Sequence, residues 1–229
     1  MSSPETDTDE AAETPVVDEA RDAVVAAFTD ALGDGVVESY VKPGCDVVLR
    51  VRADAWLATA DAARNALGYR FFDFLSAIDW MPSPFGRDME AEQDWAVHGR
   101  DETETEPMVQ GYAGGSTRFQ VFARVYSLYD HLGVTLKVDV PDDTLAVDSW
   151  VSVYSGVNWH EREAHEMYGV VFEGHPGLRH LYLPGDFEGH PLRKDFPLVS
   201  RRVKPWPGIV DVEGMPGDDD ESSDEEAAS

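Results

Sequence analysis

The sequence contains a single cysteine among its 229 residues. Cys45 cannot form a disulfide within the chain, and one thiol is too few for an iron–sulfur cluster, which normally takes four cysteine-type ligands. No apolar run reaches the roughly 18 residues needed to cross a bilayer, and the N-terminus lacks the basic and apolar pattern of a signal peptide. These absences predict a cytoplasmic chain that does not cross a membrane by itself.

Acidic residues are concentrated at the two ends of the chain. The net charge of −27 includes seven acidic residues between positions 1 and 19 and nine between 211 and 229, with no Lys or Arg in either stretch. Such runs are typical of solvated, disordered ends, and we interpret residues 1–14 and 211–229 as acidic tails. No basic patch is available to offset phosphate repulsion, so the sequence disfavours nucleic-acid binding.

Between the tails, the hydrophobic pattern predicts one α+β domain over residues 15–175. A helical stripe begins after Thr14 and ends at Gly33, and Asp54 can cap a second helix that Gly68 ends. Neighbouring strand pairs follow helices that cluster at the start, which favours N-terminal helices packed on a mixed β-sheet. The strands are expected at residues 36–41, 46–52, 69–80, 116–126 and 134–140.

Residues 82–113 interrupt this pattern. The stretch is acidic, contains proline and glycine, and has little hydrophobic periodicity. We therefore expect a long surface loop inserted between two strands of the sheet.

Catalytic and cofactor-binding motifs are missing. His160 and His165 superficially resemble a zinc-binding helix, but a spacing of five residues places them about 140° apart around the helix axis. The glycines in residues 111–115 lack the spacing of a dinucleotide-binding loop, and neither a phosphate-binding loop nor a nucleophile elbow is present. We therefore expect no metal site, no cofactor site and no catalytic residue in this chain.

A charged helix is predicted around Trp159. On a helix, Trp159, Arg162 and Met167 share one side with two carboxylates, Glu163 and Glu166, within about 140° of arc. A solvated charged face is the ordinary alternative, but bulky apolar groups among charges favour partial burial. An arginine between carboxylates also fixes geometry, because loss of one partner strands a charge. We interpret this side as an assembly surface.

Residues 176–210 form a proline-rich stretch without a helical or strand period. Proline removes amide donors and favours extended backbone, yet the stretch keeps aliphatic and aromatic residues that need burial. A long irregular segment is unusual inside a compact domain. We therefore predict an extended ribbon that wraps a partner, with Arg193-Lys194-Asp195 fixing its register by charge-assisted contacts. The alternative is a flexible tail without function.

The predicted helix and ribbon resemble the family of the 30 kDa subunit, also called the C subunit, of respiratory NADH:quinone oxidoreductase, or complex I. The family signature W-x-E-R-E, an acidic residue, [LM]-[FY]-G and x-F-x-G-H-P-x-L is matched from Trp159 to Leu178, and P-L-R-K-D-F-P-L is matched from Pro191 to Leu198. The residues expected at the partner interface are Trp159, Glu161, Arg162, Glu163, Glu166, Tyr168, His175, Pro176, Arg179, Pro191, Leu192, Arg193, Lys194, Asp195, Phe196 and Pro197.

The resemblance implies a non-catalytic structural subunit of the peripheral arm, on the cytoplasmic side of the cell membrane. In that complex electrons pass from NADH through FMN and iron–sulfur clusters to quinone, coupled to proton translocation, and this chain is expected to hold none of these cofactors. The implied partners are the D subunit at the quinone site, which the ribbon would wrap, and the cluster-bearing B and I subunits. Membrane contact is expected only through the complex. The alternatives are a related membrane-bound hydrogenase, a dehydrogenase with another electron donor, a metal hydrolase or a soluble adaptor.

Overall fold

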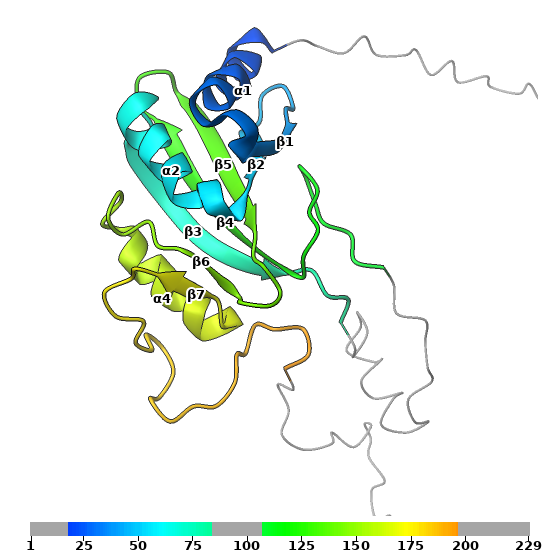
Figure 1. The fold of residues 1–229 in the computed structure, drawn as a ribbon, viewed down its shortest axis with the longest axis vertical. Helices are drawn as coiled ribbons and strands as arrows, with labels where there is room; N and C mark the ends of the chain where they lie inside the picture. Colours follow the sequence, from blue (N-terminus) through cyan, green and yellow to red (C-terminus); the bar gives the residue numbers. More distant parts are fainter. Residues whose placement is uncertain (1–17, 84–106, 197–229) are drawn as a thin grey trace, which may run out of the picture. The chain divides into compact units, whose positions relative to one another are not determined.

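A mixed five-stranded β-sheet organises the computed structural model, which describes residues 18–83 and 107–196 (Figure 1). Strands β2 and β5 pair in parallel, and the other neighbours pair antiparallel, in the order β1-β2-β5-β4-β3. The mixed sheet confirms the predicted α+β class. The strands are β1 (Val36–Tyr40), β2 (Val47–Val51), β3 (Phe71–Asp79), β4 (Phe119–Ser127) and β5 (Leu132–Asp139).

The described residues divide into two units. Residues 18–80 and 109–190 belong to the first unit, and residues 81–83, 107–108 and 191–196 belong to the second. The helices and strands described below all belong to the first unit.

Helices α1 (Glu19–Leu32) and α2 (Trp56–Asp61) cover one face of the sheet (Figure 1). Every second strand residue points to this face, and the strand register aligns one row of apolar side chains across four strands. The row packs into one core with the helices, and each member is at most 2% exposed. The row consists of Leu49, Leu136, Ala123 and Leu75.

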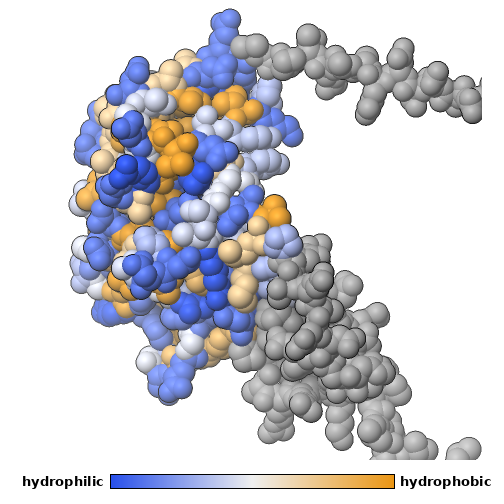
Figure 2. Space-filling model, turned by 45° about the vertical axis from the view of Figure 1, so that its right-hand side comes forward, coloured by the Kyte–Doolittle hydropathy of each residue, from blue (hydrophilic) through white to orange (hydrophobic). Residues whose placement is uncertain are grey.

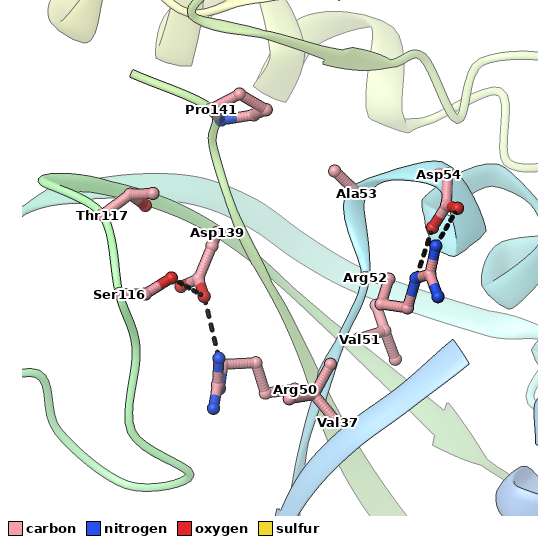
Figure 3. A pocket seen from close by; sticks show the side chains of 10 residues that line it. All are labelled: Val37, Arg50, Val51, Arg52, Ala53, Asp54, Ser116, Thr117, Asp139 and Pro141. Carbon is pink, nitrogen blue, oxygen red and sulfur yellow. Dashed lines mark hydrogen bonds and ion pairs between the residues drawn. The ribbon is translucent and has the colours of Figure 1, made fainter. Parts of the chain in front are cut away.

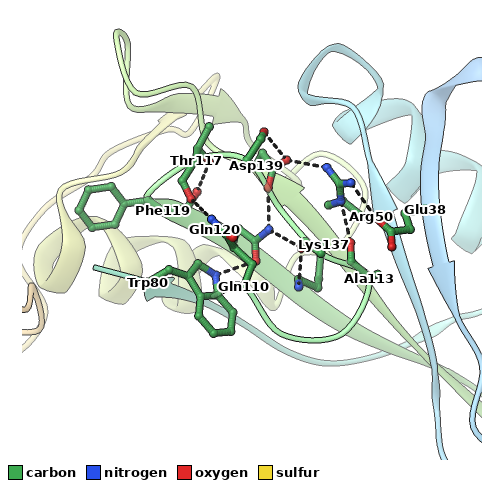
Figure 4. Close-up of polar contacts among 12 residues, drawn as sticks. Glu38, Arg50, Trp80, Gln110, Ala113, Thr117, Phe119, Gln120, Lys137 and Asp139 are labelled. Atoms are coloured by element: carbon green, nitrogen blue, oxygen red, sulfur yellow. Dashed lines mark hydrogen bonds and ion pairs between the residues drawn. The ribbon is translucent and has the colours of Figure 1, made fainter. Parts of the chain in front are cut away.

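Polar side chains on the opposite face of the sheet hold the returning end of the loop insert (Figure 4). The Lys137 ammonium donates to the Tyr112 carbonyl at 2.7 Å, and the Arg50 guanidinium donates to the Ala113 carbonyl at 2.7 Å. The Gln120 amide donates to the Gly114 carbonyl at 3.0 Å. Three successive carbonyls are therefore bound to the sheet, so this end of the predicted surface loop is packed. Residues 84–106 of that loop lie outside the described residues.

Helix α4 (Val157–Tyr168) lies along the edge strand β3 (Figure 1). The Leu75 N–H donates to His160 Nδ1 at 3.4 Å, and the His160 ring meets Phe72 edge-on. The helix connects two short parallel strands, β6 (Ala146–Asp148) and β7 (Val171–Glu173). Because an unpaired strand edge invites pairing with other chains, α4 protects this edge of the sheet.

The N-terminal helices differ from the sequence prediction at their starts. Asp18 caps α1 through its side chain, whereas the predicted cap, Thr14, lies outside the described residues. The second helix was expected to begin at Asp54, but the Asp54 carboxylate instead accepts from Arg52 at 2.9 Å. This segment consists of a 3₁₀ turn, α2 and a π-helical turn over residues 62–66. A local ion pair has taken the side chain that would have capped the helix.

Other parts of the prediction agree with the structure. All five predicted strands are present, with ends that differ by at most three residues. Gly33 ends α1 with a positive φ of 55°, as expected. The three-residue strands β6 and β7 were not predicted, since segments this short carry no periodic signal. Within residues 18–83 and 107–196, no helix has the length and apolar character needed to cross a membrane.

The central row of the core predicts the outcome of a matched pair of substitutions. Leu136→Ala should lower the free energy of unfolding by about 2–5 kcal/mol, because it leaves a cavity at a fully buried site. Leu128→Ala makes the same chemical change at a side chain that is 58% exposed, and it should cost under about 1 kcal/mol. Urea denaturation of the two variants measures the difference. Equal losses would contradict the described packing.

Candidate functional site

Helix α4 presents its charged residues to two different surroundings. It ends at Gly169, whose φ of 81° is left-handed and whose N–H donates to the His165 carbonyl at 2.8 Å. Val157, Glu161 and Ala164 face the interior, because residues three and four apart share one side of a helix. Two of the helix's carboxylates, those of Glu161 and Glu166, are buried, with relative exposures of 0% and 1%.

Glu161 connects α4 to the segment that follows β6. Its carboxylate accepts from the Ser149 hydroxyl and from the Trp150 N–H, each at 2.6 Å. Trp150 in turn stacks on Trp56, with ring centroids 4.1 Å apart, and donates its indole N–H to the Trp56 carbonyl at 3.0 Å. Burial raises the pKa of Glu161 to about 7, although the bonds from Ser149 and Trp150 lower it. Glu161 therefore anchors α4 in the core.

Glu166 binds the segment that follows β7, which we name the strap (residues 175–190). Its carboxylate accepts three successive backbone N–H groups, those of Leu181 at 2.8 Å, Tyr182 at 3.1 Å and Leu183. Burial raises the pKa of Glu166, but the N–H groups of Leu181, Leu183 and Tyr182 together lower it more, so the net shift is downward. Such charge-assisted bonds are about twice as strong as neutral ones.

Arg162 binds the strap one helical turn before Glu166. Its Nε donates to the Arg179 carbonyl at 3.0 Å, and an Nη donates to the His180 carbonyl at 3.1 Å. The helix pattern alone predicted that Arg162 lies between two glutamates. In the structure its guanidinium instead binds backbone carbonyls of the strap. Together, Arg162 and Glu166 form what we call the clamp. Arg162 donates hydrogen bonds to carbonyls of the strap, and Glu166 accepts hydrogen bonds from its N–H groups.

Exposed aromatic side chains lie on the outer side of the clamp. Trp159 is 61% exposed, and the Arg162 guanidinium lies over its ring at 5.3 Å. Tyr182 is 64% exposed, and its hydroxyl donates to Glu163 at 2.9 Å. His190 closes the strap by a 2.9 Å bond to the Glu166 carbonyl. The result is a surface with Trp, Tyr and Arg side chains, the residue types enriched at interaction hot spots.

The predicted interface residues differ in their burial and in the unit to which they belong. Trp159, Pro176 and Arg179 are exposed on the first unit, whereas the buried carboxylates of Glu161 and Glu166 support that surface from within the chain. Glu161 and Glu166 were expected to contact a partner, whereas their carboxylates are buried within this chain. The remaining first-unit members, Arg162, Glu163, Tyr168 and His175, are half-buried. Residues 191–196 belong to the second unit, and Pro197 lies outside the described residues.

The sequence pattern missed four residues of this region. Ser149 and Trp150 bind Glu161, while Tyr182 and His190 bind Glu163 and the Glu166 backbone. Each partner lies 11 or more residues away along the chain. No local periodicity carries such contacts, although a histidine and a tyrosine within an irregular, proline-rich stretch are a weak signal.

A shallow groove between β2 and the start of β4 is the other candidate (Figure 3). Its cations already have carboxylate partners: Arg50 pairs with Asp139 at 2.8 Å, and Arg52 pairs with Asp54. Ser116 also donates to Asp139, at 3.0 Å. The groove therefore offers no free positive charge to an anionic ligand. Across the described ranges, no cluster of three or more His, Cys, Asp or Glu side chains is placed to hold a metal ion.

The molecular surface also lacks one dominant apolar face in the view of Figure 2. Hydrophilic residues cover most of that face, with small apolar patches between them. The clamp surface is distinguished by two exposed aromatic side chains, those of Trp159 and Tyr182.

Comparisons with known proteins place this site within a family. The family described as "Respiratory-chain NADH dehydrogenase, 30 Kd subunit" matches residues 49–202, which include α4 and the strap. The C subunit of NADH-quinone oxidoreductase from Stenotrophomonas maltophilia (strain K279a) is 34% identical over 199 residues, covering 76% of this chain and 78% of that protein. The C subunit from Xanthomonas campestris pv. campestris (strain B100) is 32% identical over 196 residues, with the same coverage.

A solved structure shares the fold. A chain of the membrane-bound sulfane sulfur reductase, an archaeal respiratory membrane complex, aligns with a TM-score of 0.51 and 17% identity, covering 78% of this chain and 86% of that one. The chain belongs to the family of 30 kDa subunits of respiratory-chain NADH dehydrogenase. It is thus a subunit of the NADH-quinone oxidoreductase type, which confirms the resemblance read from the signature.

The clamp predicts that a neutral side chain at position 166 loosens the strap. Glu166→Gln keeps the shape but replaces one acceptor oxygen by an NH₂ group, which leaves backbone N–H groups unpaired and should cost about 1–3 kcal/mol. Hydrogen exchange at Leu181 and Leu183 should accelerate accordingly. Glu163→Gln, which touches only the Tyr182 hydroxyl among these groups, is the control and should leave those amides protected. Unchanged exchange in Glu166→Gln would argue against the clamp.

Glu161 predicts a pH dependence with a definite sign. Its pKa in the folded chain, about 7, lies above the ordinary value of 4.5, so its contribution to stability is complete below pH 4.5 and is lost as pH rises through 7. Relative to Glu161→Gln, the wild type should lose up to about 3 kcal/mol over this interval, at about 1.4 kcal/mol per pKa unit. Denaturation of both proteins at several pH values measures the difference. A constant difference would refute the raised pKa.

Proposed function

We propose that this chain is a non-catalytic structural subunit of the peripheral arm of a proton-translocating NADH:quinone oxidoreductase. Its role is to fix the position of the subunits around the quinone site while electrons pass from NADH through FMN and iron–sulfur clusters to quinone. Those cofactors belong to other subunits. The chain lies on the cytoplasmic side of the cell membrane and reaches the membrane only through the complex.

The observation that carries the proposal is the surface formed by α4 and the strap, which the clamp joins by hydrogen bonds. Exposed Trp159 and Tyr182 lose little conformational freedom on binding a partner, because Arg162 and Glu163 already hold them in place. The clamp fixes the backbone beneath them. A preorganised aromatic surface in a family of complex subunits supports a docking role better than a catalytic one.

The partner of this surface is the D subunit at the quinone site, and the cluster-bearing B and I subunits are its neighbours. The segment that begins at Pro191 continues from the strap and wraps the D subunit, with Arg193 and Lys194 providing charge-assisted contacts. Electron transfer and quinone entry need neighbours held in fixed positions, and a subunit without its own redox centre serves that need by its contacts.

Purification of the tagged chain tests this function. Membranes extracted in mild detergent should yield the chain in a large assembly with bound FMN and iron and with NADH:quinone reductase activity. An assembly active with another electron donor would assign the chain to a related dehydrogenase. A lone, cofactor-free protein, recovered from cells that respire through this enzyme, would reject the subunit role in favour of a soluble adaptor.

Charge reversal tests the wrapping segment. The double substitution Arg193→Glu and Lys194→Glu should lower the yield of assembled complex at least about tenfold, since breaking a buried charged contact costs about 2–5 kcal/mol. The free chain should stay folded. Arg70→Glu, which lies on the first unit away from this segment in sequence, serves as the control. A loss of free-chain stability equal to the assembly loss would place both side chains in the chain's own core instead.

A further inference from the structure

His175 occupies the start of the strap and joins it to α4. Its Nδ1 lies 2.9 Å from the Gly177 nitrogen, and its Nε2 lies 3.3 Å from the Asn158 carbonyl oxygen in the first turn of α4. A backbone N–H only donates and a carbonyl only accepts. Nδ1 therefore carries no proton, and Nε2 carries the ring's one N–H proton. The hydrogen bonds require a neutral ring in one tautomer.

Three other histidines of this region are bonded in the reverse sense. His165, His180 and His190 each place Nδ1 against a backbone carbonyl, at 2.8–2.9 Å. Their Nδ1 atoms donate, so none of these three bonds requires an Nδ1 without a proton. His175 differs from these three because a second ring proton would have to sit on the atom that accepts from Gly177. His160 is bonded in the same sense as His175, since its Nδ1 accepts from the Leu75 N–H at 3.4 Å. Protonation and the Gly177 hydrogen bond exclude each other.

The surroundings of His175 also disfavour the charged ring. Burial lowers its pKa from the ordinary value of 6.5, the Asn158 carbonyl raises it, and the charges of Arg162 and His165 on α4 lower it again. The net shift is downward. The folded chain therefore takes up this proton less readily than the unfolded chain, so the contribution of the bond is complete above pH 6.5 and is lost as pH falls through the lowered pKa.

We propose that His175 is a proton-operated latch on the strap. The neutral ring ties Gly177 to the first turn of α4, and a proton on Nδ1 breaks that tie and frees the start of the strap. Glu166 and Arg162 hold the later residues 179–183, so the release is local. The latch is a property of this chain alone, while its consequence, weaker docking of partners in acid, rests on the proposed function.

Hydrogen exchange of the free, full-length chain tests the latch. The observable is the protection factor of the Gly177 amide, corrected for the intrinsic exchange rate at each pH between 5 and 8. In the wild type it should fall at low pH, by about tenfold for each unit by which the pKa of His175 lies below its ordinary value. In His175→Asn, whose Oδ1 can replace Nδ1 as the acceptor and cannot titrate, protection should be independent of pH.

Two controls decide the remaining outcomes. In His165→Asn, the protection of the Gly177 amide should depend on pH as it does in the wild type. Loss of that pH dependence in His165→Asn would overturn the proposal. If His175→Asn loses protection at every pH, NMR titration of the wild type decides: the His175 ring and the Gly177 amide must share one midpoint, and separate midpoints overturn the latch. A pH-independent wild type also overturns it. None of these readouts requires assembly, so they stand even if the chain fails to co-purify with an oxidoreductase.

Discussion

Irregular backbone that packs against a protein must find partners for its N–H and C=O groups, and this requirement shapes the region around α4. The strap has no hydrogen-bond ladder of a strand or helix. One acidic and one basic side chain on α4 supply hydrogen bonds to its backbone instead. Glu166 accepts three successive N–H groups, and Arg162 donates to two carbonyls. The i,i+4 spacing puts both side chains on one side of the helix. The exposed surface of Trp159 and Tyr182 depends on this clamp.

The clamp is useful only if α4 itself is fixed. Glu161 fastens the inner side of the helix to Ser149 and Trp150, in the aromatic part of the core. His160 meets the free edge of β3 from the same helix. Consecutive residues of one short segment thus point to the sheet, the core and the strap, which explains how the helix transmits the rigidity of the sheet to the outer surface. A partner that docks there meets a surface whose geometry is set by the core.

The sequence predicted the parts that repeat and missed the parts that depend on distant contacts. Runs of branched, aromatic or alternating apolar residues located the five sheet strands, and the signature around Trp159 located α4 and the family. Strands β6 and β7 are too short to show a period. The helix pattern placed Glu166 on a partly buried assembly surface, and Glu161 was expected at the partner interface, because the sequence contains no information about the core segment and the strap that bury them. The ribbon was expected to need a partner throughout, yet residues 179–183 find theirs within the chain.

The central claim is that the surface of α4 and the strap contacts another member of the complex. A photo-crosslinking amino acid placed at Trp159 in the intact membrane complex tests it directly, with the same amino acid at Tyr129, which is 84% exposed on the turn between β4 and β5, as the reference. The account predicts that position 159 crosslinks to a different subunit of the complex. Crosslinks from position 159 that stay within this chain, in an active and fully assembled complex, would contradict it.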